Sequence, residues 1–274
     1  MLTFPPAKIN LGLYVIEKRP DGYHNLETVF YPVPLCDTLE TAPLLHSNAP
    51  YAFQQVGLHI EGTAEDNLVV RVYLSMKEEF GLPALDIYLD KHIPTGAGLG
   101  GGSSDAAHMM KQLNEQFGLG LGTKDMERRL SAFGADCPFF VCERPVLATG
   151  IGDRFTPVSL TLKGWTLVLV KPAIHVSTRE AYGGIVPQRP DTNLADAIAR
   201  PVEEWRDTLH NDFERNVFAA HPEIGAIKAT LYDCGATYAA MSGSGSAVFG
   251  LFRHPVESIP TVFKDCFVFQ QNLR

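Results

Sequence analysis

Apolar and polar residues alternate along residues 84–92, where Leu85, Ile87 and Leu89 are separated by Asp86, Tyr88 and Asp90. This period of two predicts a strand with one buried face, and the proline that follows it at position 94 ends the ladder.

A helical period begins after a glycine-rich stretch. Ala106, Met110, Leu113 and Phe117 recur at helical spacing until Gly118 ends the run. A side-chain oxygen of Ser103 or Ser104 is expected to cap this helix. The glycines therefore lie between a strand and the N-terminus of a helix.

The same patterns predict a mixture of helices and strands along the rest of the chain. Further strands are expected at residues 3–17, 27–35, 139–141, 146–149 and 165–170, and further helices at 66–80, 123–133 and 221–233. A hairpin around Gly243 and Gly245 precedes a short helix and strand at the C-terminus. We place one domain boundary near residue 160, which divides the chain into domains 1–160 and 161–274.

The glycine-rich stretch suits an anion. Its backbone amides can approach a phosphate with no Cβ in the way, and the helix N-terminus adds free N–H groups and a positive dipole end. Gly96, Gly98 and Gly101 fit G-x-G-x-x-G, but a second helix follows where a Rossmann unit would continue into a strand. A Walker A loop is excluded, because Gly102-Ser103-Ser104 has no lysine. The remaining alternative is a flexible glycine hinge.

Composition places the chain among ordinary globular proteins. Its 274 residues can bury two cores, and 45% of them are hydrophobic. The net charge of −8 argues against a wide nucleic-acid surface. No apolar run approaches a membrane span, so we expect a cytoplasmic protein without a membrane partner. Its five cysteines show no C-x-x-C pair, so reduced thiols are expected rather than disulfides or zinc ligands.

Three segments carry a family resemblance. Residues 94–107 read Pro-x-x-x-Gly-Leu-Gly-x-Gly-Ser-Ser-x-Ala-Ala, which resembles the ATP loop of the GHMP kinases. Residues 6–13 with Arg-Pro-Asp-Gly-Tyr-His at 19–24, and Gly-Ala-Asp-Cys-Pro-Phe-Phe at 134–140, resemble the members of that family that act on a cytidine diphosphate substrate. A third glycine segment lies at residues 241–246.

The resemblance implies an α+β fold with a ribosomal-S5-like N-terminal domain and a ferredoxin-like C-terminal domain. It also implies an ATP- and Mg²⁺-dependent kinase, a monomer or homodimer, that phosphorylates the 2-hydroxyl of 4-diphosphocytidyl-2-C-methyl-D-erythritol in non-mevalonate isoprenoid biosynthesis. The alternatives are another small-molecule GHMP kinase, acting on a mevalonate-type substrate or homoserine, and a non-catalytic nucleotide- or RNA-binding module.

Lys8 and Asp136 are the candidate catalytic residues. An inward lysine in an apolar strand is costly unless it is paired, and a carboxylate at Asp136 would remove that cost. The ammonium would keep this carboxylate ionised and stabilise charge developing on the acceptor oxygen. The alternatives are an edge-strand lysine facing solvent and a turn carboxylate.

The resemblance supplies the binding residues. The ATP-binding candidates are Pro94, Thr95, Gly96, Ala97, Gly98, Leu99, Gly100, Gly101, Gly102, Ser103 and Ser104, with Asn67 and Lys91 at the adenine. Ser104 is also a candidate contact to the magnesium of Mg-ATP, and Asn67 has a helix cap as its alternative. The substrate-binding candidates are Asn10, Tyr23, His24, Phe30, Thr178, Tyr182, Gly243 and Ser244. Core packing is the alternative for the aromatic residues, above all Phe30.

Overall fold

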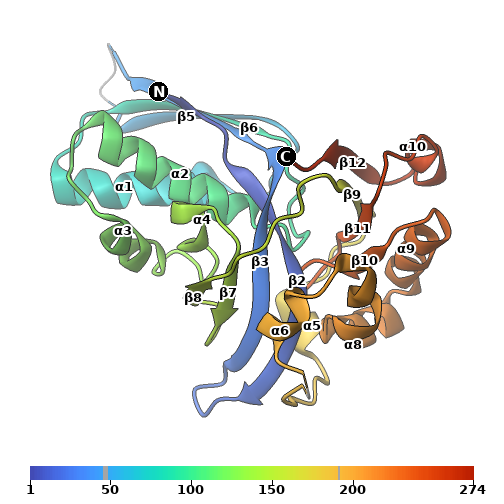
Figure 1. Ribbon diagram of the computed structural model, residues 1–274. Coiled ribbons are helices and arrows are strands. Elements are labelled where there is room, and N and C mark those ends of the chain that lie inside the picture. The colour runs from blue at the N-terminus through green and yellow to red at the C-terminus, as the bar shows by residue number, and fades with distance from the viewer. Residues whose placement is uncertain (46–48, 191) are drawn as a thin grey trace. The chain divides into compact units, whose positions relative to one another are not determined.

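The computed structural model describes residues 1–45, 49–190 and 192–274 (Figure 1). Its contacts divide the chain into two compact units that interleave along the sequence. The first unit holds Met1–Ala7, Leu35–Thr95 and Gly100–Glu143, and the second holds Lys8–Pro34, Gly96–Leu99 and Arg144–Arg274. These units differ from the halves expected on either side of residue 160.

A four-stranded sheet forms one layer of the first unit. Its order is β1(Leu2–Thr3), β4(Thr38–Pro43), β6(Leu85–Lys91) and β5(Tyr51–Gly57). β5 runs parallel to β6, whereas the other neighbours are antiparallel. The alternation expected in β6 is confirmed, because Leu85, Ile87 and Leu89 are fully buried.

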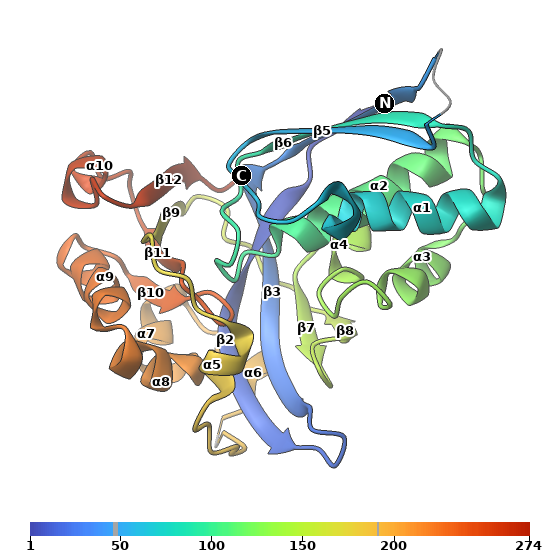
Figure 2. The ribbon, with the colours of Figure 1, turned by 180° about the vertical axis from the view of Figure 1, so that it is seen from behind.

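Helices cover one face of this sheet. In Figures 1 and 2, α1(Leu68–Phe80) and α2(Gly101–Gln116) lie side by side beneath it. Gln112 in α2 donates from Nε2 to the Leu39 carbonyl of β4, which fixes the helix against the sheet. α1 ends where expected, at Gly81 in the left-handed conformation. The unit also holds η1(Ala64–Asp66), α3(Thr123–Leu130) and α4(Phe139–Cys142).

Two local expectations are wrong. Residues 139–141 form part of helix α4 rather than a strand, because hydrogen bonds from the Phe139 and Phe140 amides to Asp136 and Cys137 close helical turns. Helix α2 begins at Gly101 with Gly100 as its cap residue, so neither Ser103 nor Ser104 caps it.

A second four-stranded sheet explains why the units interleave. It has the order β2(Pro6–Lys18), β3(His24–Cys36), β7(Val146–Thr149) and β8(Arg154–Pro157). β3 pairs antiparallel with β7, with Thr28 opposite Ala148. This long-range pairing joins residues near the N-terminus to those that follow Glu143. Most of the β2–β3 hairpin therefore belongs to the second unit.

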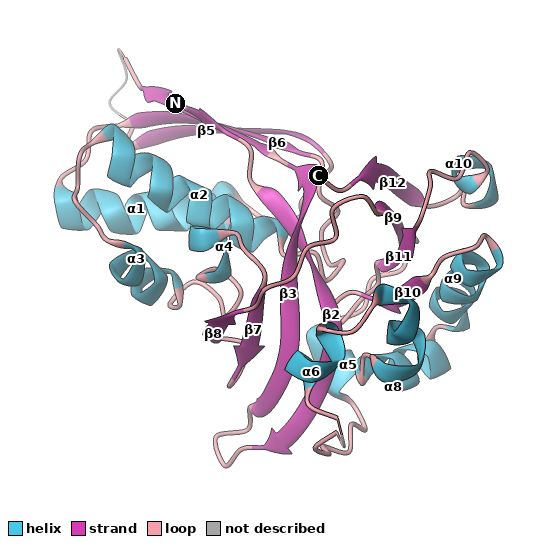
Figure 3. Cartoon of the chain, viewed as in Figure 1, coloured by secondary structure: helices cyan, strands magenta, loops and turns pink. Residues whose placement is uncertain are grey.

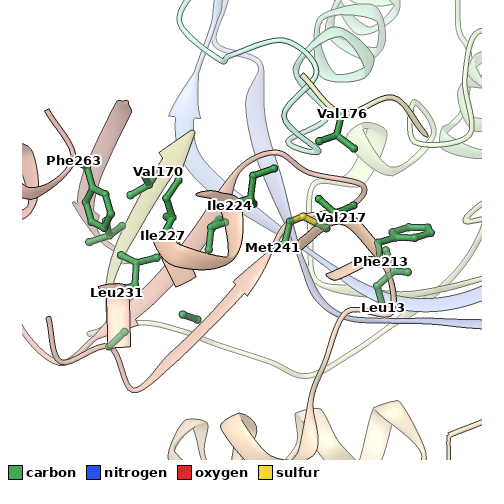
Figure 4. Close-up of a cluster of buried hydrophobic side chains, with 14 of the residues drawn as sticks. Leu13, Val170, Val176, Phe213, Val217, Ile224, Ile227, Leu231, Met241 and Phe263 are labelled. Atoms are coloured by element: carbon green, nitrogen blue, oxygen red, sulfur yellow. The ribbon is translucent and has the colours of Figure 1, made fainter. Parts of the chain in front are cut away.

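The third sheet is antiparallel throughout, in the order β10(Tyr238–Met241), β11(Val248–Phe252), β9(Thr166–Lys171) and β12(Phe267–Asn272). Helix α9(Pro222–Asp233) packs against it, and Figure 4 shows Ile224, Ile227 and Leu231 of this helix beside Val170 of β9. The unit's other helical segments are α5(Thr178–Tyr182), α6(Leu194–Ile198), η2(Val202–Glu204), α7(Trp205–Thr208), α8(Phe213–Ala220) and α10(Ile259–Val262).

The predicted α+β class is confirmed, since each unit combines sheets with helices (Figure 3). The strand near residues 165–170, the helix near 221–233, the hairpin and the C-terminal helix and strand are also confirmed. In the described part of the chain no helix has both the length and the apolar character that crossing a membrane requires.

Candidate active site

The glycine loop joins β6 to α2 through several left-handed residues. Gly96, Gly98 and Gly100 have φ values of 58°, 71° and 72°, which side-chain-bearing residues rarely adopt. Ala97 and Leu99 between them are buried and anchor the loop. The backbone therefore turns sharply at alternate positions before the helix begins.

Five consecutive carbonyl oxygens of this loop are engaged by protein donors. The Gly96 and Ala97 carbonyls accept from the Ser246 and Ala247 amides, and the Gly98 carbonyl accepts from the Ser242 hydroxyl. The carbonyls of residues 99 and 100 accept from the Lys8 and Ser104 amides. Each of these carbonyl oxygens therefore already accepts a hydrogen bond from the protein. The amides of Gly101, Gly102 and Ser103 lie in the first turn of α2, where an α-helix offers them no internal acceptor.

Ser104 adds an unused polar atom at the same place. Its side chain is fully buried, and its Oγ has no hydrogen-bond partner. Buried hydroxyls in folded proteins nearly always have one, so an unsatisfied Oγ beside free amides suits a ligand that supplies the missing contact. A hydroxyl oxygen can bind a phosphate through its proton or a magnesium ion through its lone pairs.

Glycine is required in this loop chiefly for packing within the protein. A Cβ on Gly98 would lie 1.9 Å from the Ser242 carbonyl oxygen, and one on Gly101 would lie 2.9 Å from Ile93 Cγ2. At Gly102 the nearest atom would be 4.0 Å away, and the residue is exposed. Gly102 is therefore the loop position where an added side chain meets open space.

Lys8 is buried as expected, with 3% of its surface exposed, so it does not face solvent. Its Nζ donates to Asn10 Oδ1 at 2.7 Å and lies 4.8 Å from the centre of the Phe30 ring. Asn10 Nδ2 donates in turn to Thr28 Oγ1. The Ser242 hydroxyl lies within 3.5 Å of Asn10 Oδ1 and also donates to the Gly98 carbonyl. The network joins Lys8 and Asn10 to the glycine loop.

Phe30 has little surface to offer a substrate. It is 2% exposed, lies beneath the Lys8 ammonium, and contacts Phe155 with a ring-centre distance of 6.2 Å. Core packing explains this residue, as the alternative reading anticipated, and a direct base contact at Phe30 stays a prediction.

Asp136 lies in the tight turn that leads into α4, in the first unit. Its neighbour Cys137 is buried and hydrogen-bonded to Ser103 at the start of α2. Burial raises the pKa of the Cys137 thiol to about 11, so this side chain stays a neutral thiol that ties the turn to the helix. Lys8 belongs to the second unit, and its pairing with Asp136 stays a prediction.

Two of the expected base-binding residues lie together in the second unit. The His24 and Tyr182 rings are stacked, with centres 4.7 Å apart and planes 20° from parallel. Phe213 meets the Tyr182 ring edge-on. Burial and the charge of Lys18 lower the pKa of His24, so its imidazole is neutral at pH 7, with one nitrogen as donor and the other as acceptor. Tyr23 is 61% exposed.

Other expected residues have different surroundings. Thr178 is an exposed residue in the first turn of α5. Gly243 packs against the loop, since a Cβ on it would lie 3.2 Å from Gly98 Cα, and the half-buried Ser244 follows it. Asn67 caps α1 by accepting the Val69 amide, so the cap alternative is confirmed, while its adenine contact stays a prediction.

Lys91 lies in a buried ion cluster. It is 1% exposed, and its ammonium is held by the carboxylates of Asp37 and Asp105. Its side chain is thus occupied within the protein, and its adenine contact stays a prediction. An alternating strand places every second side chain inward, and Lys91 continues the buried series of Leu85, Ile87 and Leu89.

Sequence reasoning missed several residues of the site. Thr28 and the Ser242 hydroxyl complete the Lys8 network, and the His175 ring packs on Gly96, where an added Cβ would lie 2.4 Å from Nδ1. The glycine-serine segment at 241–246 was the one signal that pointed to Ser242. Nothing in the residues around Thr28 or His175 marks them.

Comparison with known proteins gives a consistent result. The family model for the GHMP kinases N-terminal domain matches residues 67–144, and that for the GHMP kinases C-terminal domain matches residues 194–264. A 4-diphosphocytidyl-2-C-methyl-D-erythritol kinase of Bacteroides fragilis is 56% identical over the full length of both chains, and one of Parabacteroides distasonis is 50% identical, also over both full lengths.

Solved structures agree. The chain superimposes on a 4-(cytidine 5'-diphospho)-2C-methyl-D-erythritol kinase with a TM-score of 0.81 at 30% identity, covering 99% of each chain. The mevalonate kinase of Methanococcus jannaschii gives a TM-score of 0.70 at 12% identity, covering 100% of this chain and 98% of that one, which shows a common fold.

Proposed function

The chain belongs to the GHMP kinases, in their 4-diphosphocytidyl-2-C-methyl-D-erythritol kinase group, and from this premise we propose how it works. It transfers the γ-phosphoryl group of ATP to the 2-hydroxyl of 4-diphosphocytidyl-2-C-methyl-D-erythritol, in non-mevalonate isoprenoid precursor biosynthesis. ADP is the second product. We place the reaction in the cytoplasm.

The observation that carries this proposal is the engagement of the carbonyl oxygens of residues 96–100 by protein donors. A loop whose carbonyls are turned into the protein repels an anion less than one that exposes them. The free amides of the first turn of α2 then supply donors and a positive dipole end to the nucleotide phosphates.

Magnesium would arrive on the ATP phosphates, and the Ser104 hydroxyl is the side chain we propose as its contact or as a phosphate donor. The unsatisfied, buried Oγ supports this. The ion would neutralise charge on the transferred phosphoryl group.

In the transfer step the acceptor oxygen attacks the γ-phosphorus as the bond to the β-phosphate oxygen breaks. We propose that Asp136 orients the hydroxyl and takes its proton. Lys8 stabilises the charge that develops on the oxygen, and its bond to Asn10 holds the ammonium in one position.

The acceptor's base would be recognised in the second unit. The stack of His24 on Tyr182 supports this proposal, because it places two of the expected aromatic residues together, and a base that stacks on Tyr182 would replace or extend this contact. The neutral His24 ring supplies both a donor and an acceptor for a base edge. Asn10 and Thr178 are the proposed polar contacts to the rest of the acceptor.

Removing the Tyr182 ring should weaken acceptor binding. We expect Tyr182→Ala to cost about 1–3 kcal/mol of acceptor binding, because base–aromatic stacking elsewhere has this magnitude, and Tyr182→Phe to cost little. Calorimetric titration with the cytidine diphosphate substrate measures both. His24→Ala should add a loss of preference for cytidine over uridine, since a mismatch leaves polar groups unpaired. Normal acceptor affinity in Tyr182→Ala would rule out the stacking role.

The second candidate function is phosphorylation of another small alcohol, supported by the fold shared with mevalonate kinase. An ADP-release assay that offers the cytidine diphosphate substrate, mevalonate 5-phosphate and homoserine in parallel separates the two. We expect ADP release with the first alone. Release with either of the others at a comparable kcat/KM would favour the second candidate.

A further inference from the structure

A histidine side chain lies against the first left-handed glycine of the loop, within the second unit. His175 belongs to the connection between β9 and α5, and it is exposed. A Cβ on Gly96 would lie 2.4 Å from the His175 Nδ1 and 2.7 Å from its Cε1. The imidazole therefore covers the Cα of Gly96, and a side chain at that position would collide with the ring.

The residues on either side of His175 are fixed. The Ile174 carbonyl accepts a hydrogen bond from Ser246 Oγ at 2.5 Å, and Val176 is 3% exposed within the hydrophobic core. The Ser246 amide also donates to the Gly96 carbonyl, so one serine holds both the connection and the loop. The neighbours of His175 thus keep its ring beside the loop without any bond from its own nitrogens.

The ring nitrogens of His175 are unused by the protein. Neither has a hydrogen bond or an ion pair with any residue that the structure describes. Nδ1, Cε1 and Cγ are the atoms nearest to a Cβ on Gly96, so Nε2 lies farther from the loop backbone than these. In the tautomer with its proton on Nε2, the ring has a donor free for a ligand. An exposed donor ordinarily bonds to water, and its place beside the glycine loop is what gives this one a different partner.

A phosphate is the ligand that suits a donor at this place. Phosphate oxygens are strong acceptors, and hydrogen bonds to charged oxygens are stronger than those between neutral groups. His175 contacts the loop proposed to hold phosphate, and the chain after it enters α5, which carries the proposed acceptor contacts Thr178 and Tyr182. Both proposed substrates bring phosphates, ATP in its triphosphate and the acceptor in its diphosphate.

We propose that His175 is a further substrate-binding residue, which donates a hydrogen bond from Nε2 to a phosphate oxygen of a substrate held at the glycine loop. The residue then serves the proposed function, on which this inference rests, since that function supplies the phosphate-bearing substrates. In a packing role the ring would only fill the space over Gly96. Packing needs the shape of the ring, whereas binding needs its N–H.

Three variants separate the two roles. His175→Phe keeps an aromatic ring over Gly96 and removes the N–H, His175→Ala removes both, and His175→Gln replaces the ring by an amide that carries N–H donors. Calorimetric titration should give a Kd at least about tenfold above wild type in the first two variants, because a hydrogen bond to a charged group is lost. His175→Gln should stay within about threefold of wild type. The proposal is overturned if His175→Phe binds as wild type does, or if His175→Gln is as weak as His175→Ala.

The ligands titrated identify the source of the phosphate. Each variant is titrated with ATP and with adenosine, and with the cytidine diphosphate substrate and with cytidine. A weaker Kd for ATP assigns the contact to the nucleotide, and a weaker Kd for the acceptor assigns it to the acceptor's diphosphate. Adenosine and cytidine have no phosphate, so their Kd values should not change. An equal loss for a nucleoside and its phosphate-bearing counterpart would contradict a phosphate contact.

His254→Phe is the matched control, because it makes the same change at another exposed histidine of the second unit. It should leave all four Kd values unchanged. The unfolding temperatures of the His175 variants should lie within about 2 °C of wild type, since substitutions of exposed side chains cost little stability. A loss of affinity that accompanies a much lower unfolding temperature, or a His175→Phe variant that does not fold, would show packing instead and overturn the proposal.

The wild-type titrations test the proposed function separately. If wild type bound neither ATP nor the cytidine diphosphate substrate, the proposed function would fall before any variant was compared. If wild type bound both and His175→Phe bound both equally well, only the role of His175 would fall.

Discussion

An Asp136→Asn enzyme should turn over at least about 100-fold more slowly than wild type while binding ATP almost as well. The amide has nearly the shape of the carboxylate, but it can neither accept the hydroxyl proton nor pair with a cation. The effect should therefore fall on kcat rather than on the calorimetric Kd for ATP. Turnover within about threefold of wild type would remove Asp136 from the chemistry.

Lys8→Met should give a loss of similar size, because the ammonium is buried and held by Asn10. The double variant should lose clearly less than the product of the two single losses, since residues that act as a unit are not additive. Lys163→Met, at an exposed lysine, is the matched control and should keep wild-type turnover. Full additivity would mean that Lys8 and Asp136 act independently, against the proposed pairing.

Local patterns predicted much of the site's framework. The alternation in β6, the inward Lys8 and the left-handed end of α1 at Gly81 all follow from residue type and spacing. These features depend on neighbours within one turn or one strand. The same is true of the glycine loop, which lies between a strand and the start of a helix, as its flanking patterns predict.

Features that depend on distant partners were not predicted. β4, β5 and β8 were missed, and β4 is defined by pairing with β1 and β6 rather than by its own alternation. The short apolar run at residues 139–141 fits either a strand or a helix, and the turn at Asp136 and Cys137 decides for the helix. The interleaving of the two units likewise depends on the pairing of β3 with β7.

Lys91 shows the limit for site residues. Its place beside the loop is evident from the sequence, but its partners come from positions 37 and 105 and cannot be read from spacing. A basic residue near a phosphate loop fits either a ligand contact or a buried ion pair. The inward face of β6 and the two carboxylates place Lys91 in the ion pair, and its adenine contact stays a prediction.

Two glycine variants should separate the loop's packing from its ligand. Gly98→Val should lower the free energy of unfolding by about 3 kcal/mol or more, because its φ of 71° strains a branched residue and its Cβ would overlap the Ser242 carbonyl oxygen. Chemical denaturation measures the loss. A change of less than about 1 kcal/mol would mean that the loop and the segment at 241–246 do not pack as described.

Gly102→Val should keep the fold and lose nucleotide instead. The new side chain meets no protein atom closely, yet it stands among the first-turn amides of α2, where the phosphates are proposed to bind. We expect the KM for ATP to rise at least about tenfold, which is 1.4 kcal/mol of binding, with the acceptor's affinity unchanged. Gly122→Val makes the same change at the start of α3 and serves as the control, with an unchanged KM. An unchanged KM in Gly102→Val would mean that the phosphates bind elsewhere, because a valine side chain among these amides would obstruct them.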